Sequence, residues 1–178
     1  MQVSVRLVRE SDADAVAAML ARGWSELAPW EPERAPDYLT GAGQREALRA
    51  ALELHERGQA LPALVLADGV PAGRITLSTI VRGPFRSADL GYWVDVAQHR
   101  RGVATAAVAA VLRLAFDDLG LHRVAAATLL HNAGSRRVLA RNGFAEIGVA
   151  PRYLQIAGRW QDHLLHQRLA DDLPVERT

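Results

Sequence analysis

The segment of residues 89–116 constrains the fold more than any other part of the chain. Residues 90–96 are mostly aliphatic, aromatic or β-branched, which predicts a largely buried strand. From Val103 onward Ala and Leu are frequent and apolar residues recur at helical spacing, which predicts a helix ending at Gly120. A further apolar strand is expected over residues 124–130. A strand–helix–strand unit crosses over right-handed, so its two strands should be parallel.

The flanking segments predict antiparallel hairpins and more helices. Strands are expected over residues 3–8, 61–67, 72–81, 144–154 and 160–169. Helices are expected from Ser11 to a break at Arg22, from Tyr38 or Thr40 to Gly58, and over residues 132–141. A Pro-rich loop is expected over residues 22–36. The order β-α-α-β-β-β-α-β-α-β-β predicts an α/β (α+β) fold with a mixed sheet of about seven strands and about four helices. One domain is expected over 1–170, and a tail over 171–178.

Composition narrows the range of functions. The chain has 178 residues, 49% of them hydrophobic, which is enough to bury a real core. A net charge of +1 argues against a nucleic-acid partner. The absence of Cys excludes disulfides, thiolate metal sites and a Cys nucleophile, and no metal site is expected. The N-terminus lacks a signal peptide and no apolar run reaches membrane-spanning length, so we expect a cytoplasmic protein with no membrane partner.

A short basic turn separates the expected strand from its helix. Arg100, Arg101 and Gly102 lie where the first N–H groups of a helix have no internal partner and carry the positive end of the helix dipole. Such a turn predicts an anion site of the kind that binds phosphate. Taken alone, the turn is more typical of an ordinary connection with two solvated arginines. Segments later in the chain favour the anion site.

Three further segments occur in a recognisable order. They are Leu90-Gly-Tyr-Trp93, the run Asn132-Ala-Gly-Ser-Arg-Arg-Val-Leu-Ala-Arg-Asn-Gly-Phe144, and Tyr153-Leu-Gln-Ile-Ala-Gly-Arg-Trp-Gln-Asp-His163. With the turn and the element order, they resemble the GNAT superfamily of acetyl-CoA-dependent N-acetyltransferases. The resemblance covers residues 3–169 and is strongest to the RimJ/RimL branch, which acetylates N-terminal amines of ribosomal proteins. It implies direct attack of a primary amine on acetyl-CoA in a ternary complex.

The resemblance also implies a set of cofactor contacts. The pyrophosphate loop of the family matches residues 99–104, although His99 and Arg100 depart from its usual pattern. Backbone N–H groups can still hold the diphosphate, and Asn132 would face the pantetheine arm. A backbone N–H near Trp93 or Val94 would stabilise the oxyanion. The residues expected to bind acetyl-CoA are Trp93, Val94, His99, Arg100, Arg101, Gly102, Val103, Ala104, Thr105, Asn132 and Ser135.

Two catalytic residues are expected, an acid and a general base. Many family members protonate the thiolate with a Tyr seven residues after the Asn, where this chain has Leu139. The RimJ/RimL branch uses a Ser three residues after it, which is Ser135. A structural hydrogen bond in the first helical turn is the other interpretation of this Ser. For the general base we favour Asp89, which could equally be a solvated strand-edge charge. Glu26, and Asp162 together with His163, remain alternatives.

The sequence does not identify the acceptor amine. The residues expected to contact it are Trp24, Glu26, Trp30, Tyr92 and Trp160, although tryptophans in such a loop usually pin it to the core. An α-amine with a pKa of ~8 is easier to deprotonate than a Lys amine near 10.4, which favours a peptide N-terminus. The alternatives are a small amine such as a polyamine or aminoglycoside, or a catalytically weak acyl-CoA sensor. The chain is expected to be a monomer or a homodimer.

Overall fold

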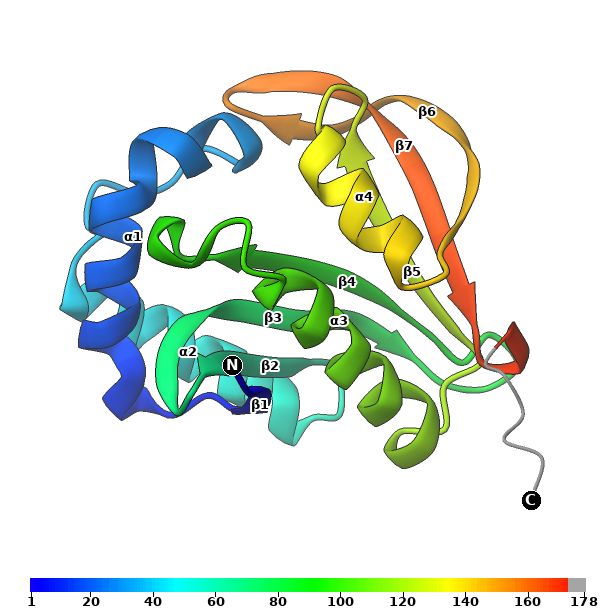
Figure 1. Ribbon diagram of the computed structural model, residues 1–178, viewed down its shortest axis with the longest axis horizontal. Coiled ribbons are helices and arrows are strands. Elements are labelled where there is room, and N and C mark those ends of the chain that lie inside the picture. Colours follow the sequence, from blue (N-terminus) through cyan, green and yellow to red (C-terminus); the bar gives the residue numbers. More distant parts are fainter. Residues whose placement is uncertain (173–178) are drawn as a thin grey trace.

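Seven strands form one twisted sheet in the order β1-β2-β3-β4-β5-β7-β6 (Figure 1). The computed structural model describes residues 1–172. The strands are β1 (Val3–Leu7), β2 (Leu61–Ala67), β3 (Val70–Val81), β4 (Ser87–Val94), β5 (Arg123–Leu129), β6 (Ala145–Ile156) and β7 (Arg159–Leu169). All neighbours are antiparallel except β4 and β5, which are parallel. The predicted element order, the mixed sheet and its central parallel pair are confirmed.

Four helices cover the sheet, two on each face. They are α1 (Ala13–Leu27), α2 (Gly41–Glu56), α3 (Val103–Arg113), which continues as a π-helical turn over Leu114–Asp118, and α4 (Ala133–Arg141). Alternate residues of β2 point to opposite faces, as the strand period requires. Leu64 packs with Met19 and Leu48 of α1 and α2, whereas Val65 packs in the cluster that contains α3. The predicted count of about four helices is therefore confirmed.

The central parallel pair is short, and this opens the sheet. Only Ser87, Ala88 and Asp89 of β4 pair with Arg123, Val124 and Ala125 of β5. Beyond these residues the two strands diverge, which Figure 1 shows as a widening gap between the green β4 and the yellow-green β5. Helix α3 lies along the β4 side of this gap and α4 along the β5 side. The divergence creates the place where a ligand can enter the sheet.

The loop predicted over residues 22–36 is wrong at its start. Helix α1 continues to Leu27, and a 3-10 turn follows over Ala28–Trp30. The first proline of the segment is Pro29, at the start of that turn, where a missing N–H costs nothing. No residue before Pro29 prevents helix formation, and Met19 and Leu20 bury the helix against the core.

The C-terminal tail was predicted over residues 171–178. A 3-10 turn spans Ala170–Asp172, and residues 173–178 lie outside the described part of the chain. Within residues 1–172, no helix is both long enough and apolar enough to cross a membrane.

A close approach between β3 and β4 makes Gly73 a sensitive position. A Cβ atom there would lie 2.8 Å from the Cα of Val94 and closer still to the carbonyl oxygen of Trp93. We expect Gly73→Ala to destabilise the protein by about 1–3 kcal/mol, since backbone rather than a flexible side chain must move. Urea unfolding measures this. Gly91→Ala, where the added methyl meets open space, should change the unfolding free energy far less; equal losses would contradict the packing argument.

Candidate active site

The gap between β4 and β5 leads into a pocket of about 750 Å³. Its walls come from the end of α1, the diverging parts of β4 and β5, the turn before α3, the first turn of α3, one side of α4, and the hairpin formed by β6 and β7. Beyond Asp89 and Ala125, the facing edges of β4 and β5 have no partner strand. Backbone donors and acceptors on those edges can therefore bind a ligand.

The turn between β4 and α3 presents backbone N–H groups to the pocket. Arg100 and Gly102 both adopt left-handed conformations, with φ of 61° and 80°. Gly102 is the N-cap of α3 and has no capping side chain, so the N–H groups of Val103, Ala104 and Thr105 have no acceptor within the helix. These three residues line the pocket. Such a group of donors at the positive end of a helix dipole suits an anion.

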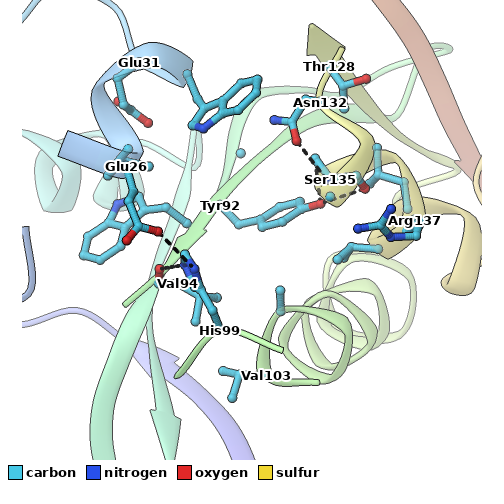
Figure 2. A pocket seen from close by; sticks show the side chains of 18 of the residues that line it. Glu26, Glu31, Tyr92, Val94, His99, Val103, Thr128, Asn132, Ser135 and Arg137 are labelled. Carbon is cyan, nitrogen blue, oxygen red and sulfur yellow. Dashed lines mark hydrogen bonds and ion pairs between the residues drawn. The ribbon is translucent and has the colours of Figure 1, made fainter. Parts of the chain in front are cut away.

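This turn is held in place from α1. Asp95, only 3% exposed, forms an ion pair with Arg22 and accepts a hydrogen bond from the Ala97 N–H at 3.2 Å. His99 donates through Nε2 to the Val94 carbonyl at 3.1 Å, and its Nδ1 lies 3.7 Å from Glu26 (Figure 2). Of the two departures from the family loop, His99 therefore connects the turn to β4 and α1.

The residues around the turn fit a CoA diphosphate. Arg100, Arg137 and Arg141 line this end of the pocket and supply positive charge. Arg101 donates to Gln98 at 3.0 Å instead and does not line the pocket. The left-handed φ of Arg100 strains the backbone, because a residue with a Cβ adopts this conformation less readily than glycine does.

Ser135 and Tyr92 meet across the gap between α4 and β4. Asn132 caps α4 by accepting the Ser135 N–H at 3.0 Å, which fixes the first turn of the helix. The Ser135 hydroxyl lies 2.8 Å from the phenol oxygen of Tyr92 (Figure 2). Burial raises the pKa of Tyr92 to about 12, so the phenol stays protonated at neutral pH. Tyr92, which was expected to contact the acceptor amine, thus forms a hydrogen bond with Ser135 of α4.

The opposite end of the pocket lies between α1 and the β6–β7 hairpin. Glu26, Trp30 and Glu31 line it from one side, and Ile156 and His163 from the other. The Ala157 N–H donates to the Glu31 carbonyl at 2.9 Å and thereby joins the two sides. The Trp30 indole also contacts the ring of His131, with centroids 5.2 Å apart. This end is partly apolar and carries acidic groups, which suits a cationic amine.

Three other residues expected at the site do not line this pocket. Trp24 packs against Tyr38 between α1 and α2, with ring centroids 5.7 Å apart. Asp89 precedes the divergence of the strands, and partial burial raises the pKa of its carboxyl. Trp160 is 62% exposed and lines a separate cavity of about 390 Å³ beside Asp162. Within residues 1–172 no cluster of three or more His, Asp or Glu side chains could hold a metal ion.

The structure also adds residues that the sequence did not assign to the site. Arg137 and Arg141 lie one helical turn apart on α4, a spacing that is visible in the sequence but was not assigned to the site. Glu31 reaches the pocket because the β6–β7 hairpin folds back against its backbone. No local signal in the sequence indicates that contact.

Comparison with known families decides what kind of pocket this is. The family described as "Acetyltransferase (GNAT) domain" matches residues 2–145. The chain belongs to this acetyltransferase family. The predicted family and fold class, the acyltransferase activity and the use of acetyl-CoA are confirmed.

The similarity of this acetyltransferase to individual proteins extends over most of its length. It is 34% identical to the [Ribosomal protein uS5]-alanine N-acetyltransferase of Escherichia coli, over 90% of this chain and 84% of that protein. It is 32% identical to the probable N-acetyltransferase YjcK of Bacillus subtilis, over 90% of both. Mycobacterium smegmatis RimJ in complex with CoA-disulfide superimposes with a TM-score of 0.94 at 35% identity, covering 97% of this chain and 84% of that one.

Proposed function

We propose that this acetyltransferase modifies the N-terminal α-amine of a ribosomal protein. The observation that carries the proposal is the continuity of the pocket, which runs from the N-terminus of α3 to an open acceptor end between α1 and the β6–β7 hairpin. The name of the E. coli relative, which acts on an alanine of ribosomal protein uS5, supports this acceptor class. Such an acceptor implies a cytoplasmic location. We also propose that the protein is a monomer or a homodimer.

Backbone direction indicates which N–H stabilises the oxyanion. The Asp95 N–H donates to the Ala72 carbonyl of β3 at 2.9 Å. Because successive N–H groups of a strand point to opposite edges, the Val94 N–H faces the split between β4 and β5. Of the two donors considered, Trp93 and Val94, we therefore favour Val94. A backbone donor fixed in a strand costs no reorganisation during the reaction.

We propose that Ser135 serves as the acid. When bound, acetyl-CoA supplies an acetyl thioester whose sulfur leaves as a thiol. Ser135 would donate its hydroxyl proton toward that sulfur, and Asn132 fixes its backbone. If Tyr92 donates to the Ser135 Oγ across 2.8 Å, the serine hydrogen is free to face the pocket. The protonated phenol also lowers the cost of negative charge on the serine oxygen.

An acceptor panel tests the proposal. Release of CoA should be measured with a peptide that begins with alanine from a ribosomal protein, the same peptide with a blocked N-terminus, a blocked peptide with one internal Lys, spermidine and an aminoglycoside. We expect turnover of the free α-amine at least tenfold above every other acceptor, because an α-ammonium near pKa ~8 loses its proton more readily than one near 10.4.

Each other result points to a different function. Faster turnover of spermidine or the aminoglycoside would indicate a small-molecule acetyltransferase. Binding of acetyl-CoA without turnover of any amine would indicate an acyl-CoA sensor. Equal rates for the free and the blocked peptide would exclude α-amine specificity.

A further inference from the structure

A buried imidazole lies at the acceptor end of the pocket. His163 of β7 is 2% exposed, yet it lines the pocket. Its Nδ1 lies 2.9 Å from the carbonyl oxygen of Gln161 on the same strand. A carbonyl oxygen only accepts, so the ring proton resides on Nδ1 and Nε2 keeps a lone pair. No residue within 1–172 forms a hydrogen bond with that Nε2.

Strand register places His163 on the face of the sheet opposite to Ser135. In the antiparallel pairing of β5 and β7, His163 lies across from Leu129, and Leu164 lies across from Thr128. Thr128 has the parity of Ala126, which packs in the cluster on the α3 side, and Tyr92 packs against that cluster too. Since neighbouring residues alternate, Leu129 and His163 face the α1 side. An amine and a thioester that meet in the split therefore have His163 on one side and Ser135 on the other.

The carboxylates near the site are less well placed to accept a proton from the amine. Glu26 has a side chain that is 61% exposed and lies 3.7 Å from His99. Glu31 is paired with Arg34. Asp162 accepts the Arg152 N–H at 2.9 Å and lines the separate smaller cavity, and Asp89 does not line the pocket.

We propose that His163 is the general base that deprotonates the acceptor amine, an assignment that rests on the proposed amine acetylation. The ammonium group loses one proton to Nε2. Its nitrogen then forms the amide bond to the acetyl carbon while the carbon–sulfur bond of the thioester breaks. The imidazolium releases this first proton to water. The sulfur takes a proton from the Ser135 hydroxyl, and the second amine proton, relayed through water, restores that hydroxyl, so that one proton is released per turnover.

The substitution His163→Asn distinguishes a role of the side chain as a base from a purely structural role. The Asn amide can still donate to the Gln161 carbonyl, but it has no basic nitrogen. We expect kcat/KM for the amine to fall about 100-fold at pH 7 with the dissociation constant of acetyl-CoA unchanged. The loss should shrink to about tenfold at pH 9, because the neutral fraction of an α-amine of pKa ~8 rises from about a tenth to about nine tenths between the two pH values. A loss of the same size at both pH values, or of less than threefold at pH 7, would overturn the assignment.

The pH dependence caused by His163 has to be distinguished from that of other titratable groups that line the pocket or contact the imidazole. They are Glu26 and Glu31 on the α1 side, Tyr92 of β4, and Tyr153 of β6, whose ring centroid lies 5.8 Å from that of His163. From β5, only Ala127 and Leu129 face it. The matched control is His166→Asn, on the same strand but the other face, where the imidazole is equally buried and lies 3.1 Å from the Thr128 hydroxyl. Any loss in that variant should be independent of pH.

A second measurement does not depend on turnover. Long-range proton–nitrogen NMR spectra distinguish the two neutral tautomers, and the six His signals are assigned by comparison with His163→Asn. We expect the neutral tautomer of His163 to carry its proton on Nδ1, and a neutral tautomer protonated at Nε2 would overturn the proposal. If the acceptor panel favours another amine, the pH comparison is repeated with that amine. The proposed acceptor would then fail while the base assignment is still tested.

Discussion

Acetyl-CoA should raise the melting temperature of the wild-type protein and leave that of a Gly102→Glu variant unchanged. At 100 times its dissociation constant, a ligand stabilises a fold by about 2.7 kcal/mol, which corresponds to roughly 5–10 °C for a chain of this size. The variant places a carboxylate beside the N–H groups of Val103, Ala104 and Thr105, where the diphosphate would lie. Repulsion between the two anions should abolish binding. Thermal unfolding with and without acetyl-CoA measures both effects.

The variant also strains the backbone, which requires a matched control. Gly102 has a φ of 80°, and a side chain there costs about 1–2 kcal/mol whatever its charge. Gly58, after α2, has a φ of 69°, and an added Cβ there would likewise meet no atom within 4 Å. It does not line the pocket. Gly58→Glu should therefore lose similar stability and keep the full response to acetyl-CoA. A normal response of Gly102→Glu would show that the turn is only a connection.

Much of the fold was predictable because its signals are local. The apolar runs of β2 and β5 and the Asp68-Gly69 turn each specify an element within a few residues. The parallel pairing of β4 and β5 followed from one helix between two strands. The end of α1 was less predictable, because its last turns are stabilised by contacts with distant residues, among them the ion pair of Arg22 with Asp95.

The proposed cofactor end of the pocket was also more predictable than the proposed acceptor end. A helix N-terminus after a glycine is visible as a short motif, so Gly102, Val103 and Ala104 could be named from the sequence. The acceptor end joins α1, β5, and the β6–β7 hairpin, which are far apart along the chain. Whether His163 or Asp89 faces the amine depends on strand register and on where β4 and β5 diverge. Neither feature is specified by neighbouring residues.

Ser135→Ala should lower kcat by about 100-fold or more, since loss of a general acid typically costs 10²–10⁴. The protein should remain folded, because Asn132 caps α4 through the Ser135 backbone N–H, which the substitution keeps. The Tyr92 phenol also retains an acceptor, the Ser135 carbonyl at 3.3 Å. Steady-state kinetics with saturating acetyl-CoA measures the loss. Ser78→Ala, an exposed serine on β3, is the control and should leave kcat unchanged.

Tyr92→Phe distinguishes a positioning role from direct proton transfer by the phenol. If Tyr92 acts only through the Ser135 hydroxyl, the variant should lose about tenfold in kcat, the equivalent of one hydrogen bond of about 1.4 kcal/mol. The double variant should then be no slower than Ser135→Ala alone, because the phenol has no hydroxyl left to orient. Multiplicative losses would instead indicate two independent roles.

The pH dependence of the Tyr92 variant follows from the direction of its shift. Burial raises the pKa of the phenol to about 12, so it keeps its proton as pH rises and loses it only near that value. Between pH 6 and 9 the wild-type phenol does not titrate, and the ratio of wild-type to Tyr92→Phe rates should stay constant. The ratio of wild-type to His163→Asn rates should fall over the same range, because an amine that is already neutral at high pH no longer needs the base. If the ratio instead fell for Tyr92→Phe and stayed constant for His163→Asn, Tyr92 rather than His163 would act in deprotonating the amine.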